Sequence, residues 1–183
     1  MCQIFGDMKK DNNVIIYLVD DDEFQLKLLQ NKFKNTTKYQ LKTFKDGESF
    51  LEHLIKNPVS KKNIVIVILD YFLKTDQASS TKNGLEILKH IREINPQISV
   101  IMYSVSDDID VATSAMHHGA INFIKKNENS FSRINNTINW IISEINLKRK
   151  RMHSKVTFRV FIGMVIVIAT ILATLYFAFP EVF

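Results

Sequence analysis

Five polar residues interrupt an apolar pattern at the ends of successive hydrophobic runs. Asp20 and Asp21 follow the first run, Asp70 ends the third, Ser104 follows the fourth, and Lys126 follows the fifth. Carboxylates that crowd together repel one another, and this raises their pKa values unless a cation joins them. The aspartates therefore predict a site for a hard divalent ion with oxygen ligands, and Mg²⁺ is the expected ion because it needs few carboxylates and keeps waters.

A hydroxyl and an ammonium opposite such an ion suit the remaining charge of a phosphoryl group. Ser104 and Lys126 supply these two groups. Asp70 is then predicted to act as a nucleophile toward phosphorus, since the ion offsets the repulsion between carboxylate and phosphate. Alone, the acidic triplet 20–22 would fit a solvated turn and helix cap equally well, and Ser104 an ordinary strand-end hydroxyl.

The apolar runs predict the strands that position these residues. The runs 14–19 and 64–69 have no polar side, which is typical of parallel strands covered on both faces. Shorter strands are expected at 39–44, 98–103 and 121–124, with helices after Asp22, Asp46 and Asn83 and at 109–118 and 129–147. Strands that alternate with helices predict an α/β fold: a doubly wound, five-stranded parallel sheet of flavodoxin-like type. Ligands bind at the carboxyl edge of such sheets.

Five segments in this order resemble the receiver domain of two-component response regulators. They are Asp20-Asp21-Asp22 after an apolar run, Ile68-Leu69-Asp70, Asn83-Gly84-Leu85-Glu86, Met102-Tyr103-Ser104, and the stretch from His117-His118-Gly119 through Phe123 to Lys126. The resemblance covers roughly residues 14–146, so a receiver domain is predicted at 14–147 after a flexible N-terminus, 1–13.

The resemblance implies a role for each matching position. Asp70 would be the phospho-accepting aspartate, Asp21 would bind Mg²⁺ directly, and Asp20 would assist through water. The backbone carbonyl of Phe72 would complete the protein ligands. The partner that donates the phosphoryl group would be a sensor histidine kinase or a phosphotransfer protein.

Three further positions carry the response to phosphorylation in this resemblance. Ser104 would hold the hydroxyl that follows the phosphoryl group inward, and Lys126 would pair with the phosphoryl oxygens. Phe123 would be the aromatic residue that changes rotamer, although its type fits a core residue equally well.

Two departures from the family pattern concern the loops beside the site. The usual Met-Pro after the phospho-accepting aspartate is missing, and the loop 73–82 is longer than usual. The proline that usually follows the lysine is replaced by Asn127. A cis peptide bond there would cost about 3 kcal/mol, so a cis bond is not assumed.

An uncharged run of 20 residues extends from Val160 to Phe179. As a helix it would be about 30 Å long, which matches the hydrocarbon core of a bilayer. It predicts a transmembrane helix at 160–179 with a short tail at 180–183; a buried core helix is the alternative. Threonines 170 and 174 with Ala178 form a small-residue face that suits a homodimer or simply faces lipid.

The positive charges cluster just before this run. Acidic and basic residues balance through residue 147, and the excess lies in a segment at 148–159 that contains Lys148, Arg149, Lys150, Arg151, Lys155 and Arg159. This position favours a membrane flank over nucleic acid as the partner. The receiver domain is thus expected on the cytoplasmic side of a bacterial inner membrane, in a single-pass, tail-anchored chain. The single cysteine, Cys2, excludes a disulfide framework.

Two functions are compatible with these features, and a third is disfavoured by them. The first is a membrane-anchored receiver that is no enzyme beyond its own phosphorylation and dephosphorylation, and that signals through contact with a membrane-associated effector protein. The second is a docking subunit of a membrane complex in which phosphorylation is vestigial. The third, a phosphatase, needs a second aspartate two residues after Asp70, where Phe72 stands.

Overall fold

A computed structural model describes the chain at 13–36, 39–60, 62–73, 83–106 and 108–178. Within these ranges, the side chains of residues 35–36, 153–160, 169 and 171–178 are not described. The chain divides into two compact units, residues 1–141 and 142–183. The predicted flexible segment 1–13, apart from Asn13, and most of the loop 73–82 lie outside the described residues.

Five parallel strands form one sheet in the first unit, in the order β2-β1-β3-β4-β5. Their bounds are β1 Val14–Val19, β2 Gln40–Phe44, β3 Ile64–Asp70, β4 Ser99–Ser104 and β5 Asn122–Lys125. Every residue of β3 is buried, as its continuous apolar run predicts, and β1 is buried apart from the partly exposed Ile15. Every residue of β4 is buried as well. The expected five-stranded parallel sheet is confirmed.

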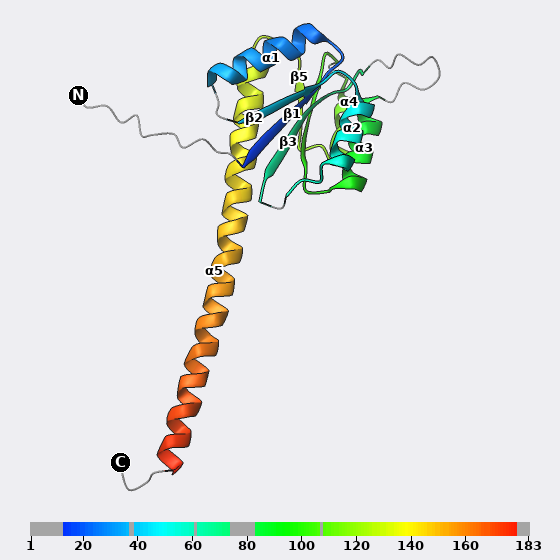
Figure 1. Ribbon diagram of the computed structural model, residues 1–183. Helices are drawn as coiled ribbons and strands as arrows, with labels where there is room; N and C mark the ends of the chain where they lie inside the picture. Colours follow the sequence, from blue (N-terminus) through cyan, green and yellow to red (C-terminus); the bar gives the residue numbers. More distant parts are fainter. Residues whose placement is uncertain (1–12, 37–38, 61, 74–82, 107, 179–183) are drawn as a thin grey trace, which may run out of the picture. The chain divides into compact units, whose positions relative to one another are not determined.

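Helices cover both faces of this sheet (Figure 1). Their bounds are α1 Glu23–Thr36, α2 Gly47–Lys56, α3 Gly84–Ile94, α4 Ile109–His117 and α5 Ser130–Ala178. Helices α2, α3 and α4 lie on one side, whereas α1 and the first residues of α5 lie on the other. The fold is therefore doubly wound, as expected.

The strand order changes direction between β1 and β3. From β1 the chain passes outward to β2, and it then returns to place β3 on the other side of β1. Such a reversal leaves a crevice at the carboxyl ends of the two central strands, where open α/β sheets bind ligands. Asp20 follows β1 and Asp70 ends β3, so both lie at this crevice.

Short polar side chains define where the helices begin. Asp22 Oδ1 accepts hydrogen bonds from the backbone N–H groups of Phe24 and Gln25, which confirms the predicted cap of α1. Asp46 accepts from Ser49 N at the start of α2, and Asn83 accepts from Glu86 N at the start of α3. These caps fix the helices that follow the carboxyl edge of the sheet.

Residues 142–178 of α5 belong to the second unit. Helix α5 continues to Ala178, beyond the limit of 147 predicted for the last receiver helix. No helix within the described residues is both long enough and apolar enough to cross a membrane. Of the predicted span, Val160, residue 169 and residues 171–179 lie outside the described side chains, as do Lys155 and Arg159 of the basic flank.

Candidate functional site

Three carboxylates converge at the carboxyl edge of the sheet. Asp20, Asp21 and Asp70 each offer an oxygen atom, and these atoms lie within 4.8 Å of one another. Strand register explains the approach, because Val19 of β1 pairs with Leu69 of β3, one residue before the aspartate on each strand. Asp20 and Asp70 are buried, while Asp21 is partly exposed.

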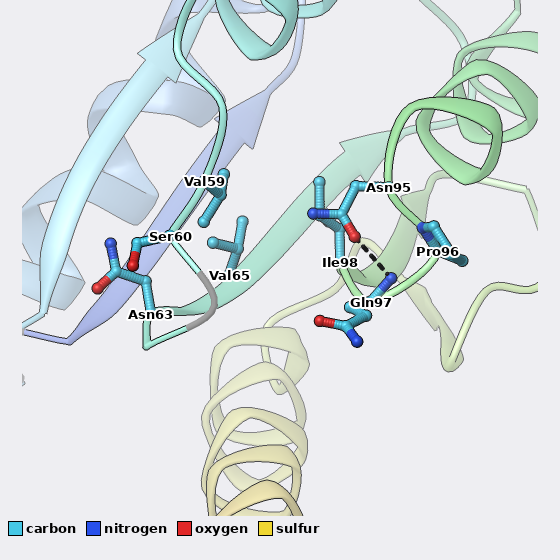
Figure 2. Close-up of a pocket in the computed structure, with 8 residues that line it drawn as sticks. All are labelled: Val59, Ser60, Asn63, Val65, Asn95, Pro96, Gln97 and Ile98. Atoms are coloured by element: carbon cyan, nitrogen blue, oxygen red, sulfur yellow. Dashed lines mark hydrogen bonds between the residues drawn. The ribbon is translucent and has the colours of Figure 1, made fainter.

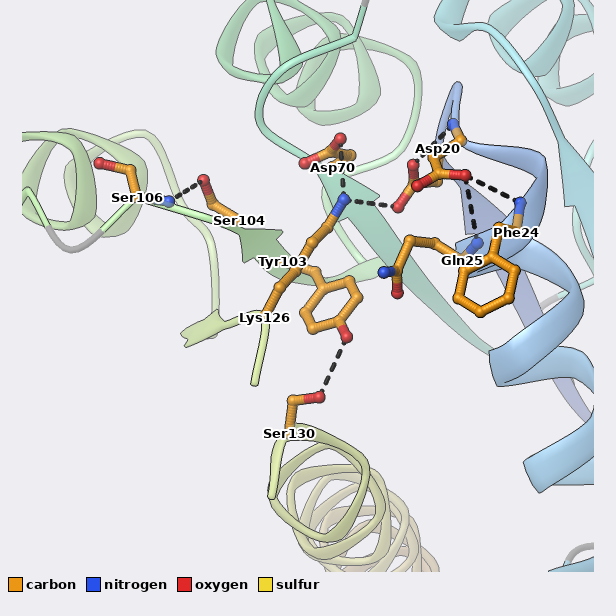
Figure 3. Close-up of polar contacts among 10 residues, drawn as sticks. Asp20, Phe24, Gln25, Asp70, Tyr103, Ser104, Ser106, Lys126 and Ser130 are labelled. Carbon is orange, nitrogen blue, oxygen red and sulfur yellow. Dashed lines mark hydrogen bonds and ion pairs between the residues drawn. The ribbon is translucent and has the colours of Figure 1, made fainter. Parts of the chain in front are cut away.

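Lys126 reaches into this cluster from the end of β5 (Figure 3). Its Nζ donates to Asp20 Oδ2 at 2.7 Å and lies 3.0 Å from Asp70 Oδ2. Its backbone N–H donates to Ser104 O at 2.7 Å, which holds the chain after β5 against the end of β4. The structure thus brings together the aspartates and the lysine that the sequence placed at separate strand ends.

One ammonium shared by two carboxylates leaves the buried cluster with excess negative charge. Burial raises the pKa of Asp20 above its usual range, and the ion pair with Lys126 only partly opposes this. Burial also acts to lower the pKa of Lys126, but the hydrogen bond and charge of Asp20 and the charge of Asp70 outweigh it and raise that pKa. The lysine therefore stays charged, and burial is expressed in the raised pKa of Asp20.

One oxygen of this cluster has no partner. Asp70 Oδ1 is buried and lacks a hydrogen-bond partner within the described part of the chain, although such groups are normally satisfied. An unpaired carboxylate oxygen beside two further carboxylates is a donor set that suits a hard divalent cation. The residues present therefore fit Mg²⁺, with Asp20, Asp21 and Asp70 as the side chains that would hold it.

The other predicted site residues lie as follows. Ser104 is fully buried at the end of β4, and its Oγ accepts a hydrogen bond from Ser106 N at 3.2 Å. Phe123 is partly buried and packs against the apolar core. The side chain of Phe72 is 49% exposed, with its ring against Tyr71. The roles of the Phe72 carbonyl as a ligand and of Phe123 and Ser104 as a switch stay predictions.

The peptide bond after Lys126 is trans, because no cis bond occurs among the described residues. Asn127 thus replaces the usual proline without a cis bond, which settles a point that the sequence left open.

Gly84 determines how closely α3 approaches Asp70. Its N–H donates to Tyr71 O at 2.8 Å, and a Cβ atom at this position would overlap the carbonyl oxygen of Asp70 and lie 2.9 Å from Tyr71 Cα. The backbone of Asp70 and Tyr71 leaves no space for a side chain, so glycine is required for this close approach.

We expect Gly84→Ala to lower the free energy of unfolding by about 1–3 kcal/mol, the usual cost of overpacking. Urea denaturation of the full-length chain measures this change. Gly163→Ala is the matched control, because a Cβ there meets nothing within 4 Å. Equal stability of Gly84→Ala and the parent chain would show that the backbone after β3 can shift to accommodate the methyl group without loss of stability.

Sequence reasoning missed two residues beside the site. Tyr103 and Ser130 are both buried, and their hydroxyl groups are 3.0 Å apart (Figure 3). A tyrosine within an apolar strand was the available signal, since a buried phenol hydroxyl needs a partner.

A separate hollow of about 290 Å³ lies at the opposite, amino-terminal ends of β3 and β4 (Figure 2). The residues that line it are Val59, Ser60, Asn63, Val65, Asn95, Pro96, Gln97 and Ile98. None of these side chains titrates, and Asn95 Oδ1 already accepts from Gln97 N at 2.9 Å. This hollow therefore offers no side chain for acid or base chemistry, in contrast to the aspartate edge.

Comparison with known proteins agrees with this geometry. Residues 16–139 match the family model of the response regulator receiver domain. Among curated relatives, Response regulator protein TmoT of Ectopseudomonas mendocina is 29% identical over 116 residues, which cover 63% of this chain and 47% of TmoT. Transcriptional regulatory protein MalR of Bacillus subtilis is 24% identical over 111 residues, which cover 61% of this chain and 43% of MalR. The chain spans about half the length of these relatives.

Solved structures resemble the first unit. NtrX from Brucella abortus superposes with a TM-score of 0.62 at 26% identity, over 74% of this chain and 29% of NtrX. The BeF3-activated DrrB receiver domain superposes with a TM-score of 0.56 at 26% identity, over 70% of this chain and 97% of that domain. The fold, the aspartate cluster and the family match agree, and the chain belongs to the response regulator receiver domain family, the phospho-accepting domains of two-component systems.

Proposed function

We propose that Asp70 accepts a phosphoryl group from the phosphohistidine of a sensor kinase or phosphotransfer protein, and that the chain then signals by contact with an effector protein. The observation that carries this proposal is the buried Oδ1 of Asp70, which has no hydrogen-bond partner among the described residues and lies beside Asp20, Asp21 and Lys126. Family membership supports it, because receiver domains interact with histidine kinases or phosphotransfer proteins.

The proposed step forms one bond and breaks one. Asp70 Oδ1 attacks phosphorus, the new O–P bond forms, and the P–N bond to the donor imidazole breaks as that nitrogen takes up a proton. Lys126 Nζ already lies 3.0 Å from Asp70 Oδ2, so its charge is available to phosphoryl oxygens on Asp70. Ser104 lies at the end of the neighbouring strand β4, which suits a hydroxyl partner for the same group.

Mg²⁺ would offset the repulsion between the incoming phosphoryl group and the carboxylates when it is bound by Asp20, Asp21 and Asp70. The chain itself supplies the preformed cluster. Because the sheet holds these oxygen atoms within 4.8 Å of one another, little rearrangement is needed to form the site. We propose no turnover of an external substrate beyond formation and hydrolysis of the aspartyl phosphate.

Beryllofluoride with Mg²⁺ tests the proposal on the full-length chain, because this complex mimics an aspartyl phosphate. Acetyl phosphate should label the chain, and beryllofluoride should shift the NMR signals of residues around Asp70 only when Mg²⁺ is present. A chain that shows neither the adduct nor the shift would refute phosphorylation. The docking alternative would then account for the fold, and a partner captured equally by the parent chain and Asp70→Asn would support it.

We also propose that residues 160–179 anchor the chain in a membrane, with the basic flank 148–159 on the cytoplasmic side. The support is the sequence: an uncharged run of 20 residues directly follows the basic cluster. The described large apolar side chains within this run are exposed, which suits a lipid environment; they are Phe161, Ile162, Met164, Val165, Ile166, Val167 and Ile168. An effector at the membrane and a homodimer through the same helix belong to this proposal.

Cell fractionation tests the anchor. We expect the full-length chain to pellet with membranes and to resist extraction from them by alkaline carbonate. The double variant Val165→Arg/Ile168→Arg should move largely to the soluble fraction, because each arginine at the centre of a span costs about 2.5–3.5 kcal/mol. Val165→Leu/Ile168→Leu is the matched control and should stay in the pellet. A parent chain in the soluble fraction would exclude the anchor.

A further inference from the structure

The ring of Tyr103 lies beside the reactive edge. In the sheet register Tyr103 of β4 pairs with Asp70 of β3 and with Ile124 of β5, two residues before Lys126. The side chain is 3% exposed. Lys126 Nζ lies over the ring, 5.2 Å from its centroid, which is within the range of an attractive cation–π contact.

The hydroxyl of Tyr103 ties this ring to helix α5. It lies 3.0 Å from Ser130 Oγ, and both side chains are buried (Figure 3). Ser130 is the first residue of α5, and its backbone N–H donates to Asn127 O. The next residue, Phe131, packs its ring against Phe33 of α1 at 5.2 Å. Two packed helices therefore fix the serine that holds the phenol.

Lys126 needs such support because of its own flexibility. A lysine ammonium sits on a four-carbon stem and gains many conformers when it is released. Its ammonium donates a hydrogen bond to Asp20 and pairs with Asp70, and the charge on Asp70 changes when that residue is phosphorylated. The contact with the Tyr103 ring does not depend on the charge of Asp70.

We propose that Tyr103 is a positioning residue for Lys126: its ring holds the ammonium at the phosphorylation site, and its hydrogen bond to Ser130 holds the ring. This inference rests on the proposed phosphorylation of Asp70. The resemblance to receiver domains assigned no role to Tyr103 or to Ser130.

Affinity for beryllofluoride in the presence of Mg²⁺ measures the effect on the full-length chain. Tyr103→Leu removes the ring and should weaken binding about tenfold, as expected for a desolvated cation–π contact. Tyr103→Phe keeps the ring and should restore most of this loss. Ser130→Ala should resemble Tyr103→Phe. Tyr17→Phe is the matched control, since Tyr17 is equally buried but packs against Phe44 and Phe50.

A double-mutant cycle separates positioning of Lys126 from general packing. In a Lys126→Ala background, Tyr103→Leu should cause little further loss of beryllofluoride affinity, because the group that it positions is gone. A full tenfold loss in that background would overturn the proposal. A parent chain that binds no beryllofluoride would instead refute the proposed function.

NMR of the Lys126 ammonium provides a readout that needs no phosphoryl mimic. A buried, hydrogen-bonded ammonium should give a discrete ¹H–¹⁵N signal in the parent chain and in Tyr103→Phe, and this signal should disappear in Tyr103→Leu. An unchanged signal in Tyr103→Leu would show that the aspartates alone fix the lysine, and it would overturn the proposal whatever the outcome with beryllofluoride.

Discussion

Replacement of Asp70 by asparagine is expected to abolish labelling of the full-length chain by acetyl phosphate. An amide at this position presents no anionic oxygen to phosphorus, and Asp70 Oδ1 is the buried oxygen that the described structure leaves without a partner. Intact-mass spectrometry in the presence of Mg²⁺ should show a phosphoryl adduct on the parent chain and none on Asp70→Asn. Beryllofluoride should likewise leave the NMR spectrum of the variant unchanged.

This loss should not come from unfolding. Asp70→Asn removes one of two buried negative charges that share a single ammonium, so the free energy of unfolding should stay the same or rise. Asp46→Asn is the matched control: Asp46 caps α2, and asparagine caps a helix about as well. A phosphoryl adduct that persists on Asp70→Asn would move the acceptor to another residue and refute the assignment.

The sheet and the cap of α1 were predictable because they depend on local patterns. In an α/β fold, a short continuous apolar run is typical of a strand that helices cover on both faces. The runs that begin at Val14 and Ile64 were therefore expected to form central strands, as they do. An aspartate that precedes a helical pattern has an N-cap as its ordinary use, and Asp22 occupies this position. Such features need no knowledge of distant residues.

Contacts between distant residues were predictable only to the level of a sheet edge. Strand order places Lys126 near Asp20, 106 residues away, but no local pattern shows that its ammonium bonds both Asp20 and Asp70. The pairing of Tyr103 with Ser130 was missed for the same reason. Strand propensity explains the tyrosine in β4 without any hydrogen bond, and Ser130 alone resembles many residues at helix starts.

The extent of α5 has a simple local cause. Neither glycine nor proline occurs from Ser130 to Ile162, so the chain contains no residue that would end the helix near 147. The sequence pattern changed in polarity there, from an amphipathic segment to a basic one. A change in polarity alters the surroundings that a helix prefers, but it does not interrupt the backbone hydrogen bonds.

Asp21→Asn is expected to weaken Mg²⁺ binding by more than about 100-fold, above the 10–100-fold typical of the loss of an outer-shell partner. Asp21 contributes an oxygen to the cluster but lies outside the ion pairs of Lys126, which join Asp20 and Asp70. The substitution therefore removes a carboxylate from the proposed metal site and leaves both ion pairs in place. Labelling by acetyl phosphate should fall with it at millimolar Mg²⁺.

The neighbouring Asp22→Asn separates this effect from a general loss of charge. Both variants lose one negative charge at adjacent positions, but Asp22 caps α1, and asparagine preserves that cap. Each full-length variant is titrated with Mg²⁺, and binding is measured by isothermal calorimetry and by NMR shifts near Asp70. Asp22→Asn should keep near-parental affinity for Mg²⁺, whereas Asp21→Asn should not. Equal weakening of Mg²⁺ binding in both variants would mean that the cluster attracts the ion only through its summed negative charge. Such a result would remove Asp21 from the set of direct ligands, because a ligand acts through its position and a field acts through summed charge.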